Sequence, residues 1–345
     1  MADNNPDSGS AHSADSSTHS LVQSSQSETL PNGLEQALLR LARGERRDLA
    51  ALLHDVEVHA TIDGTRVTCH CHSVRVDNAG RPRVADLADA ICESALDFAI
   101  PRSEIERARA VDARTGATRQ LTRLHNVARG LFTDLVNSGE GGELLLFVLA
   151  ETALRLPQVM CKMSLKTNTR MHVHGVDGVH AGVDPGTDQL ALYWGESKIY
   201  HDASTAIRDC LQSLAPVLLG VGPEGAAARD LQLLQRAADL NDSVLEDALK
   251  VFLDPRSEAY NQLEFRGLCL VGFNSDAYPS QGGVHDAVVQ AILGQLPAWK
   301  AQIQRRVNAE QLARFALHVF CVPFPDVDHF RAHMRRFLGL SDVAA

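Results

Sequence analysis

Two charged side chains stand in a segment that otherwise has the pattern of a buried strand. The segment Leu192–Tyr200 reads LYWGESKIY, and Glu196 and Lys198 lie two residues apart in it. Residues i and i+2 of a strand project to the same face, so both charges would point into whatever covers that face. Either that face meets water or the two charges have a chemical function.

A turn signal before this segment predicts what lies opposite Glu196. The sequence PGTD, residues 185–188, separates two strand-like runs and is typical of a tight turn. If Asp184 and Gln189 close the hairpin, the register places Asp177 directly opposite Glu196. Two carboxylates and an ammonium would then meet on one face of the sheet.

A divalent metal ion would compensate these charges. The same face carries Val179 and Trp194, and unpaired charges on so apolar a surface would cost several kcal/mol each. Oxygen ligands from one or two carboxylates describe a Mg²⁺ site, which Mn²⁺ would also fit, and substrate phosphate oxygens complete the shell of Mg²⁺. The pattern predicts phosphodiester hydrolysis, with Asp177 and Glu196 as metal ligands and Lys198 orienting the attacking water or stabilising negative charge. The alternative is a structural ion pair across a solvated hairpin.

A third carboxylate could come from the helix that precedes these strands. Glu143 begins the run ELLL and could bind the same metal ion or a second one, with Glu140 as its rival. Glu143 could instead stabilise the N-terminus of the helix through the helix dipole. Asp184 is a weaker candidate ligand, because it lies at the hairpin tip, seven residues from Asp177.

Basic side chains near the proposed site could contact DNA. Lys162 and Lys166 are four residues apart and share a face if their run is a strand. They could bind the DNA backbone or edge the sheet as solvated charges. His174, like His172 and His180, could contact phosphate or transfer a proton, although single histidines on strands are commonly structural.

A helix, three consecutive strands and a second helix position these residues. The first helix, about Leu144–Leu156, ends at Pro157. The three strand-like runs are VMCKMSLK, MHVHGVDGVHAGVD and QLALYWGESKIY. Ser204 is placed to cap the second helix, which reaches about Leu219.

This order of elements resembles the core of the PD-(D/E)-x-K nuclease superfamily, whose motif corresponds here to GVDGVH and GESKIY, with Val176 where the name has proline. The wider run GELLLFVLAE, KMSLKTNT, HGVDGVHAG and LYWGESKIY resembles the HamA family, the nuclease subunits of the bacterial Hachiman anti-phage defence system, over about residues 121–219. The resemblance implies a DNA nuclease that works with a partner helicase, HamB. It also implies that Asp177, Glu196 and Lys198 form the catalytic set.

The N-terminal part of the chain predicts a tail and a small module. Residues 1–30 contain nine Ser and no Lys or Arg, a composition typical of a disordered tail. Residues 31–120 have the pattern of an α+β module, with a helix over 33–53, a hairpin around the turn IDGT, a helix over 84–98 and then a polar connector.

Residues 121–345 form the predicted nuclease domain. Its later helices are expected at Leu231–Phe252, Val284–Arg306 and Val327–Leu338, and FRGLCLVGF and FALHVFCVPF read as central strands with both faces covered. The predicted fold class is α/β. Its restriction-endonuclease-like core of a helix, a three-stranded mixed sheet and a helix carries extra strands and helices and the N-terminal module.

The composition of the chain limits the classes of function that it can have. The net charge of −10 argues against a protein that coats nucleic acid through bulk charge. We expect a cytoplasmic protein, because the sequence shows no basic-then-apolar leader and no apolar run of about 18 residues, and its seven cysteines suit reduced core thiols. No GxxxxGK[ST] loop is present, so NTP-driven unwinding would have to come from another chain.

One motif and two other functions are weighed beside the nuclease. In TCHCH, residues 68–72, the cysteines and histidines point to opposite faces of a strand, so we expect buried thiols and not a zinc site. The chain could be a non-catalytic DNA-sensing or regulatory subunit of the same complex, which keeps the charges only for folding. A nuclease directed at RNA is the third alternative.

Overall fold

The computed structural model describes residues 33–132, 139–163, 177–184, 186–187, 189–221, 226–278 and 283–340. The predicted tail, residues 1–30, lies outside these ranges, as do Lys166 and His174.

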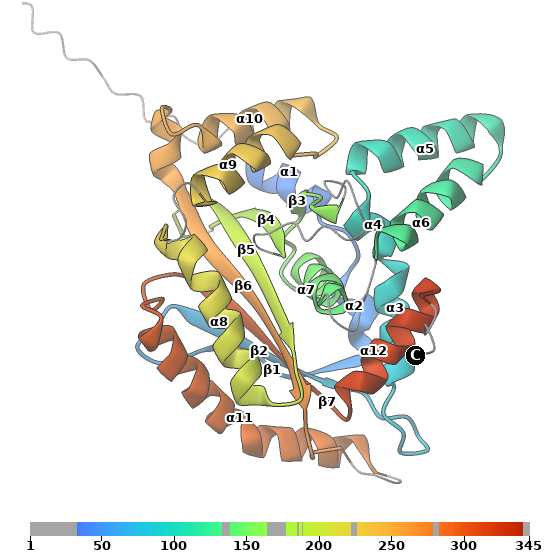
Figure 1. Ribbon diagram of the computed structural model, residues 1–345, viewed down its shortest axis with the longest axis vertical. Coiled ribbons are helices and arrows are strands. Elements are labelled where there is room, and N and C mark those ends of the chain that lie inside the picture. Colours follow the sequence, from blue (N-terminus) through green and yellow to red (C-terminus); the bar gives the residue numbers. More distant parts are fainter. Residues whose placement is uncertain are drawn as a thin grey trace, which may run out of the picture.

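A single mixed sheet of seven strands forms the centre of the fold (Figure 1), in the order β1-β2-β7-β6-β5-β4-β3. The strands are β1 (Leu53–Thr61), β2 (Val67–Val74), β3 (Gln158–Met160), β4 (Gly178–Val183), β5 (Leu190–Ile199), β6 (Leu263–Asn274) and β7 (Leu317–Phe324). Strands β2, β7, β6 and β5 are parallel, and antiparallel strands flank them on both sides. With helices on both faces, this is a mixed α/β fold, as predicted.

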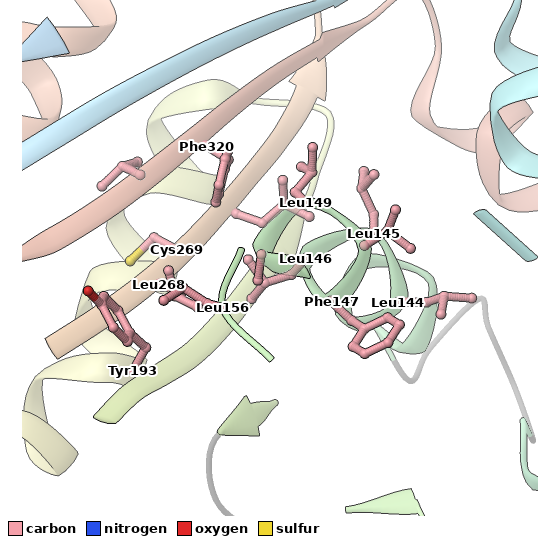
Figure 2. Packing of buried hydrophobic residues seen from close by; sticks show 14 of the residues in the cluster. Leu144, Leu145, Leu146, Phe147, Leu149, Leu156, Tyr193, Leu268, Cys269 and Phe320 are labelled. Carbon is pink, nitrogen blue, oxygen red and sulfur yellow. The ribbon is translucent and has the colours of Figure 1, made fainter. Parts of the chain in front are cut away.

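Helices cover both faces of the sheet (Figure 1). The helices are α1 (Leu34–Leu41), α2 (Arg46–Ala50), α3 (Val84–Glu93), α4 (Ala95–Ala99), α5 (Arg102–Thr115), α6 (Arg119–Leu131), α7 (Glu140–Ala153), α8 (Ala203–Leu219), α9 (Ala226–Ala237), α10 (Ser243–Leu253), the 3₁₀ helix η2 (Glu258–Gln262), α11 (His285–Ala309) and α12 (Val327–Leu338). One face is covered by α8 and α11, and the other by α7 with α3 and α12. Figure 2 shows α7 against the strands, with Leu146 and Leu149 on its sheet-facing side.

The two late strands lie at the centre of the sheet, as their continuous apolar runs predicted. Strand β6 is hydrogen-bonded to β5 on one side and to β7 on the other. Close packing of α8 depends on Gly267 of β6, because a Cβ atom there would lie 2.6 Å from Leu214 of α8 and 2.7 Å from Leu317 of β7. The absent side chain lets the helix approach β6, which is the neighbour of β5 in the sheet.

The N-terminal third contributes to the same sheet. The predicted hairpin is confirmed, because β1 and β2 pair antiparallel around the turn IDGT. Strand β2 then pairs in parallel with β7, so the hairpin forms one edge of the sheet. The predicted helix over 33–53 is broken into α1 and α2, with Gly44 at φ 67° between them.

Other local predictions were also wrong, and the predicted helix over 84–98 is two helices, α3 and α4. The polar connector between residue 98 and residue 121 contains the helix α5 and the start of α6, and these two helices pack on each other as a hairpin (Figure 1). The predicted helix Leu231–Phe252 is two helices, because Asn241 takes φ 53° and the side chain of Asp242 caps the second one. Asp202, not Ser204, caps α8 by accepting from the Thr205 N–H at 2.7 Å.

All seven cysteines are free thiols and buried, as predicted. They include Cys69 and Cys71 of the TCHCH strand, whose side chains are shielded from solvent. None of the helices within the described ranges combines the length and the hydropathy needed to cross a bilayer.

Candidate nuclease centre

The candidate site lies where β4 separates from β5. The pairing of these strands runs from Gly178 opposite Gly195 to Val183 opposite Leu190, which confirms the register that the turn signal predicted. At Asp177 the ladder ends, because the Asp177 N–H donates to the Gly195 carbonyl at 2.8 Å, one position out of register. Asp177 therefore lies beside Glu196 at the fork between the strands, but outside the paired ladder.

The carboxylate of Asp177 binds Ser197. Its Oδ2 accepts from the Ser197 N–H at 2.8 Å and from the Ser197 Oγ at 2.7 Å. Once β4 has left the ladder, the Ser197 N–H needs another acceptor, since an unpaired backbone donor in a half-buried place is costly. The Asp177 side chain supplies it. Sequence reasoning missed this role of Ser197, which the middle position of Glu-x-Lys does not signal.

Glu196 and Lys198 form an ion pair beside this carboxylate. The side chain of Glu196 is only 7% exposed and that of Lys198 is 23% exposed. Burial, followed by repulsion from Asp177, raises the pKa of Glu196 to about 7, although Lys198 and Lys162 act in the opposite direction. Burial alone would lower the pKa of Lys198, but attraction to Glu196 and then Asp177 outweighs burial and raises that pKa. Asp177, Lys198 and Lys162 are thus close enough to Glu196 to act on the pKa of its carboxyl.

Helix α8 covers the strand at this point. The thiol of Cys210 donates to the Glu196 carbonyl at 3.2 Å. Burial raises the pKa of Cys210 well above its usual value, so the thiol stays protonated. The helix therefore excludes water from one side of Glu196 without bringing a further charge.

Helix α7 packs on the other face of β5 through glycines. A Cβ atom at Gly142 would lie 3.0 Å from the Ser197 Oγ, and one at Gly195 would lie 3.2 Å from Leu146. These close approaches bring the first turn of α7 next to the residue that holds Asp177. The two glycines therefore allow α7 to pack closely against β5 at the fork.

This packing defines the position of the third predicted carboxylate. Glu143 stands in the first turn of α7, directly after Gly142, and is half-buried. Its rival Glu140 is fully buried at 2% exposure. Within the described ranges, no three His, Cys, Asp or Glu side chains are grouped so that they could hold a metal ion. Asp177 and Glu196 are the two carboxylates that the fork brings together, and the role of Glu143 stays a prediction.

The basic side chains that were predicted near the site lie in different environments. Lys162 is half-buried and close enough to Glu196 to lower the pKa of that carboxyl. His180 is fully buried on β4 and shares a 2.9 Å hydrogen bond between its Nδ1 and the Leu156 carbonyl. Burial lowers the pKa of His180 to about 4, so it stays neutral at physiological pH. His180 therefore has a structural environment, whereas Lys166 and His174 lie outside the described residues.

Asp184, the weaker candidate ligand, forms an ion pair away from the fork. It pairs with Arg266 of β6 at the far end of the β4–β5 hairpin. The hydrogen bond from Arg266 holds the pKa of Asp184 below its usual value of 3.8. The structure thus separates Asp184 from the fork and gives it a structural partner.

A comparison with protein families identifies the chain. Residues 49–338 match the model of the HamA family. This match covers most of the chain and extends well beyond the predicted similarity over residues 121–219. The chain belongs to the HamA family. HamA is a family of the Hachiman anti-phage defence system, and the matched range includes the fork, the whole sheet and the N-terminal hairpin. No curated protein matched this HamA-family chain.

Proposed function

We propose that this HamA-family protein is a metal-dependent DNA nuclease that acts in anti-phage defence together with a partner helicase. The observation that carries the proposal is the buried Glu196 carboxylate, whose pKa is raised to about 7 beside a second carboxylate and a lysine. Strongly perturbed groups that converge at a strand end are typical of catalytic sites. The membership of the chain in a defence family makes nucleic acid the natural substrate.

The residues at the fork fit a hard divalent cation. Asp177 uses Oδ2 for both of its hydrogen bonds to Ser197, so Oδ1 can face a ligand. Glu196 lies close enough to Asp177 for the two charges to repel, and a cation between them would relieve that repulsion. Mg²⁺, which retains waters and uses one or two protein carboxylates, suits this pair, with Glu143 as the candidate for a further ligand. When bound, Mg²⁺ would supply Lewis-acid polarisation of the scissile phosphate.

The side chains of this chain have separate roles in the proposed reaction. Asp177 and Glu196 would hold the ion, and Ser197 fixes the orientation of Asp177 through two hydrogen bonds. Lys198 stays protonated beside Glu196 and stabilises the negative charge that develops on the phosphate. Lys162 is the nearby cation that would contact the DNA backbone.

The proposed helicase partner follows from what the chain lacks. Its sequence contains no phosphate loop of the GxxxxGK[ST] type, so it has no means of NTP-driven unwinding by that motif. Its net charge of −10 is unfavourable for capture of DNA from solution. A partner that binds and opens DNA would deliver strands to the fork. In the Hachiman system that partner is the helicase HamB.

A cleavage assay on the copurified complex tests this function. The chain is expressed with its neighbouring helicase, and plasmid DNA is incubated with Mg²⁺, Mn²⁺ or EDTA. We expect nicking or linearisation with either metal ion and none with EDTA. Matched single-stranded DNA and RNA substrates separate a DNA nuclease from an RNA-directed one. Cleavage that persists in EDTA, or that is confined to RNA, would contradict the proposal.

A second candidate, a non-catalytic DNA-sensing or regulatory subunit, is favoured by one observation. The charges at the fork are already compensated within the protein, because Ser197 satisfies Asp177 and Lys198 pairs with Glu196. Under this reading the cluster only stabilises the fold. Loss of Lys198 would then lower the melting temperature of the chain and leave cleavage by the complex unchanged.

A further inference from the structure

A cavity lies far from the fork, on the face of the sheet that α7 covers. It has a volume of about 460 Å³, within the range of pockets that hold small-molecule ligands, and it is formed by α2, β1, β2 and the last turn of α7. The first turn of α7, next to the fork, lies about 14 Å away along the helix axis, at 1.5 Å per residue. The cavity is therefore separate from the candidate nuclease centre.

Two arginines line the polar side of this cavity. They are Arg47, which also pairs with Glu45 outside the lining at 2.7 Å, and Arg75, and Asp55 is the one carboxylate in the lining. Asp55 is held by His72, whose Nδ1 lies 2.9 Å from its Oδ1. Arg75 donates its Nε to the Ala50 carbonyl at 2.6 Å, and no carboxylate in the described residues forms an ion pair with it. The Arg75 guanidinium therefore presents charge that a ligand could neutralise.

The effect of this charge is visible on a neighbouring residue. Burial, followed by the positive charge of Arg75, lowers the pKa of His54, which also lines the cavity. The nearby carboxylates Asp55 and Asp286 act in the opposite direction. The Arg75 guanidinium therefore lies close enough to the cavity lining to act on a group there.

The cavity also offers a buried hydrogen-bonding atom and an apolar wall. His72 is 3% exposed, and its Nε2 has no hydrogen-bond partner among the described residues. Such an atom costs free energy unless a ligand or solvent atom bonds to it. Leu49, Leu53 and Leu149 line the remaining wall, where a flat, largely apolar group would pack.

We propose that this cavity binds a nucleoside phosphate, with the phosphate on Arg75 and Arg47, the base against the leucine wall and a polar atom of the ligand on the Nε2 of His72. Arginine suits the phosphate because its planar group offers paired donors to two phosphate oxygens. The site is independent of the nuclease proposal, since it uses none of the residues at the fork. A free nucleotide and the 5′-phosphorylated end of a DNA strand share this chemistry.

Calorimetric titration tests the site with the full chain and the probes AMP, dTMP, adenosine and inorganic phosphate. We expect saturable binding of at least one nucleotide and much weaker binding of adenosine and of phosphate. Arg75→Gln should weaken nucleotide binding about 10- to 100-fold, the effect of losing a charged hydrogen-bond donor. Arg47→Gln, whose side chain is 80% exposed, should weaken binding less and leave folding intact.

Arg83 provides a matched control. It donates to the Ala51 carbonyl at 2.9 Å, next to the carbonyl that Arg75 uses, but it does not line the cavity. Arg83→Gln should bind nucleotide like the unmodified chain, which separates loss of a ligand contact from loss of a local backbone contact. Nucleotide binding that is absent at millimolar concentration, or equal in Arg75→Gln and Arg83→Gln, would overturn the proposal.

Competition identifies the source of the ligand. A 5′-phosphorylated oligonucleotide that displaces the bound nucleotide, when its unphosphorylated counterpart does not, assigns the site to a DNA end. Failure of both oligonucleotides to compete assigns it to a free nucleotide. Either result supports the site, and the melting temperature of each variant verifies that the chain is folded.

Discussion

Each end of the β4–β5 hairpin carries carboxylates beside a cation, but the pKa of a carboxylate is shifted in opposite directions at the two ends. At the tip, Arg266 donates to Glu264 at 2.8 Å, to the Tyr193 hydroxyl at 3.0 Å and also to Asp184. The pKa of Asp184 is lowered there, whereas the pKa of Glu196 at the fork is raised to about 7.

The difference lies in the donors that the cation offers and in burial, since the side chain of Asp184 is 21% exposed and that of Glu196 is 7% exposed. At the tip, the guanidinium offers several donors in a planar fork and satisfies both carboxylates together. At the fork, the Lys198 ammonium pairs with Glu196, while Asp177 adds a second negative charge to a buried place. A carboxylate whose pKa is lowered by its partners stabilises the fold in its charged form. A carboxylate whose pKa is raised destabilises the fold when it is charged, and it is available to bind a ligand or to act in catalysis. The following predictions test this contrast.

The largest expected effect is on cleavage. Glu196→Gln and Lys198→Ala should each reduce Mg²⁺-dependent DNA cleavage by the complex roughly 10³-fold, because each removes charge that acts on the phosphate. Asp184→Asn, at the tip, should leave the cleavage rate within about twofold of the unmodified chain. The rates are measured on plasmid DNA, with circular dichroism to show that the variants are folded. Equal losses in all three variants would remove the distinction between the two ends.

The next effect is on stability and concerns the tip. Arg266→Met should lower the free energy of unfolding by about 3 kcal/mol, since it leaves Asp184 and Glu264 without their buried partner. Urea denaturation of the isolated chain measures the change. The fraction of the Arg266→Met variant that remains folded should still cleave DNA in the complex. A variant as stable as the unmodified chain would show that the tip network does not support the fold.

The pH dependence of stability should have opposite signs at the two ends. Because the folded-state pKa of Asp184 is below its usual 3.8, its contribution is complete above that pH and is lost as the pH falls. Because the folded-state pKa of Glu196 is raised from 4.5 to about 7, its charged form destabilises the fold as the pH rises through that range. The loss for Glu196 is on the order of 3 kcal/mol from the size of this shift.

Denaturation in EDTA between about pH 2 and about pH 8 measures both slopes. The unmodified chain should lose stability relative to Glu196→Gln as the pH rises, and relative to Asp184→Asn as the pH falls below about 4. If the stability difference between Glu196→Gln and the unmodified chain did not change with pH, the charged form of Glu196 would not destabilise the fold.

The smallest effect is the stabilisation by metal ion. At a Mg²⁺ concentration ten times its dissociation constant, the unmodified chain should gain about 1.4 kcal/mol of stability by linkage. Asp177→Asn and Glu196→Gln should abolish this gain, and Asp184→Asn should retain it. Thermal melts with Mg²⁺ and with EDTA supply the measurement. A gain that survives in Asp177→Asn would place the ion elsewhere.

Periodicity and turn signals were sufficient for most elements of the fold. The limits of α12 and the hairpin register from Gly178 to Val183 follow from the sequence, because apolar spacing and a tight turn are local properties. The helix pair α5 and α6 was missed, since these polar helices bury few residues and the amphipathic pattern of α5 is weak.

The candidate site was predicted in part. Glu196 and Lys198 could be placed on one face, because alternation along a strand is fixed by backbone geometry. The turn of Asp177 towards Ser197 could not, because it depends on where β4 leaves the ladder, and the sequence carries no signal for that point.

The sequence by itself determined which side chains share a strand, a face or a helix turn, since these relations depend on residues that are neighbours in the chain. It thereby determined the Glu-x-Lys pair, the hairpin and the apolar strands of the central sheet. Only the tertiary structure decided that β2 pairs with β7, that glycines bring α7 against Ser197, and that Arg47, Arg75 and His72 line one cavity. Those relations join residues distant in sequence, and packing in three dimensions selects among many arrangements that local patterns allow equally.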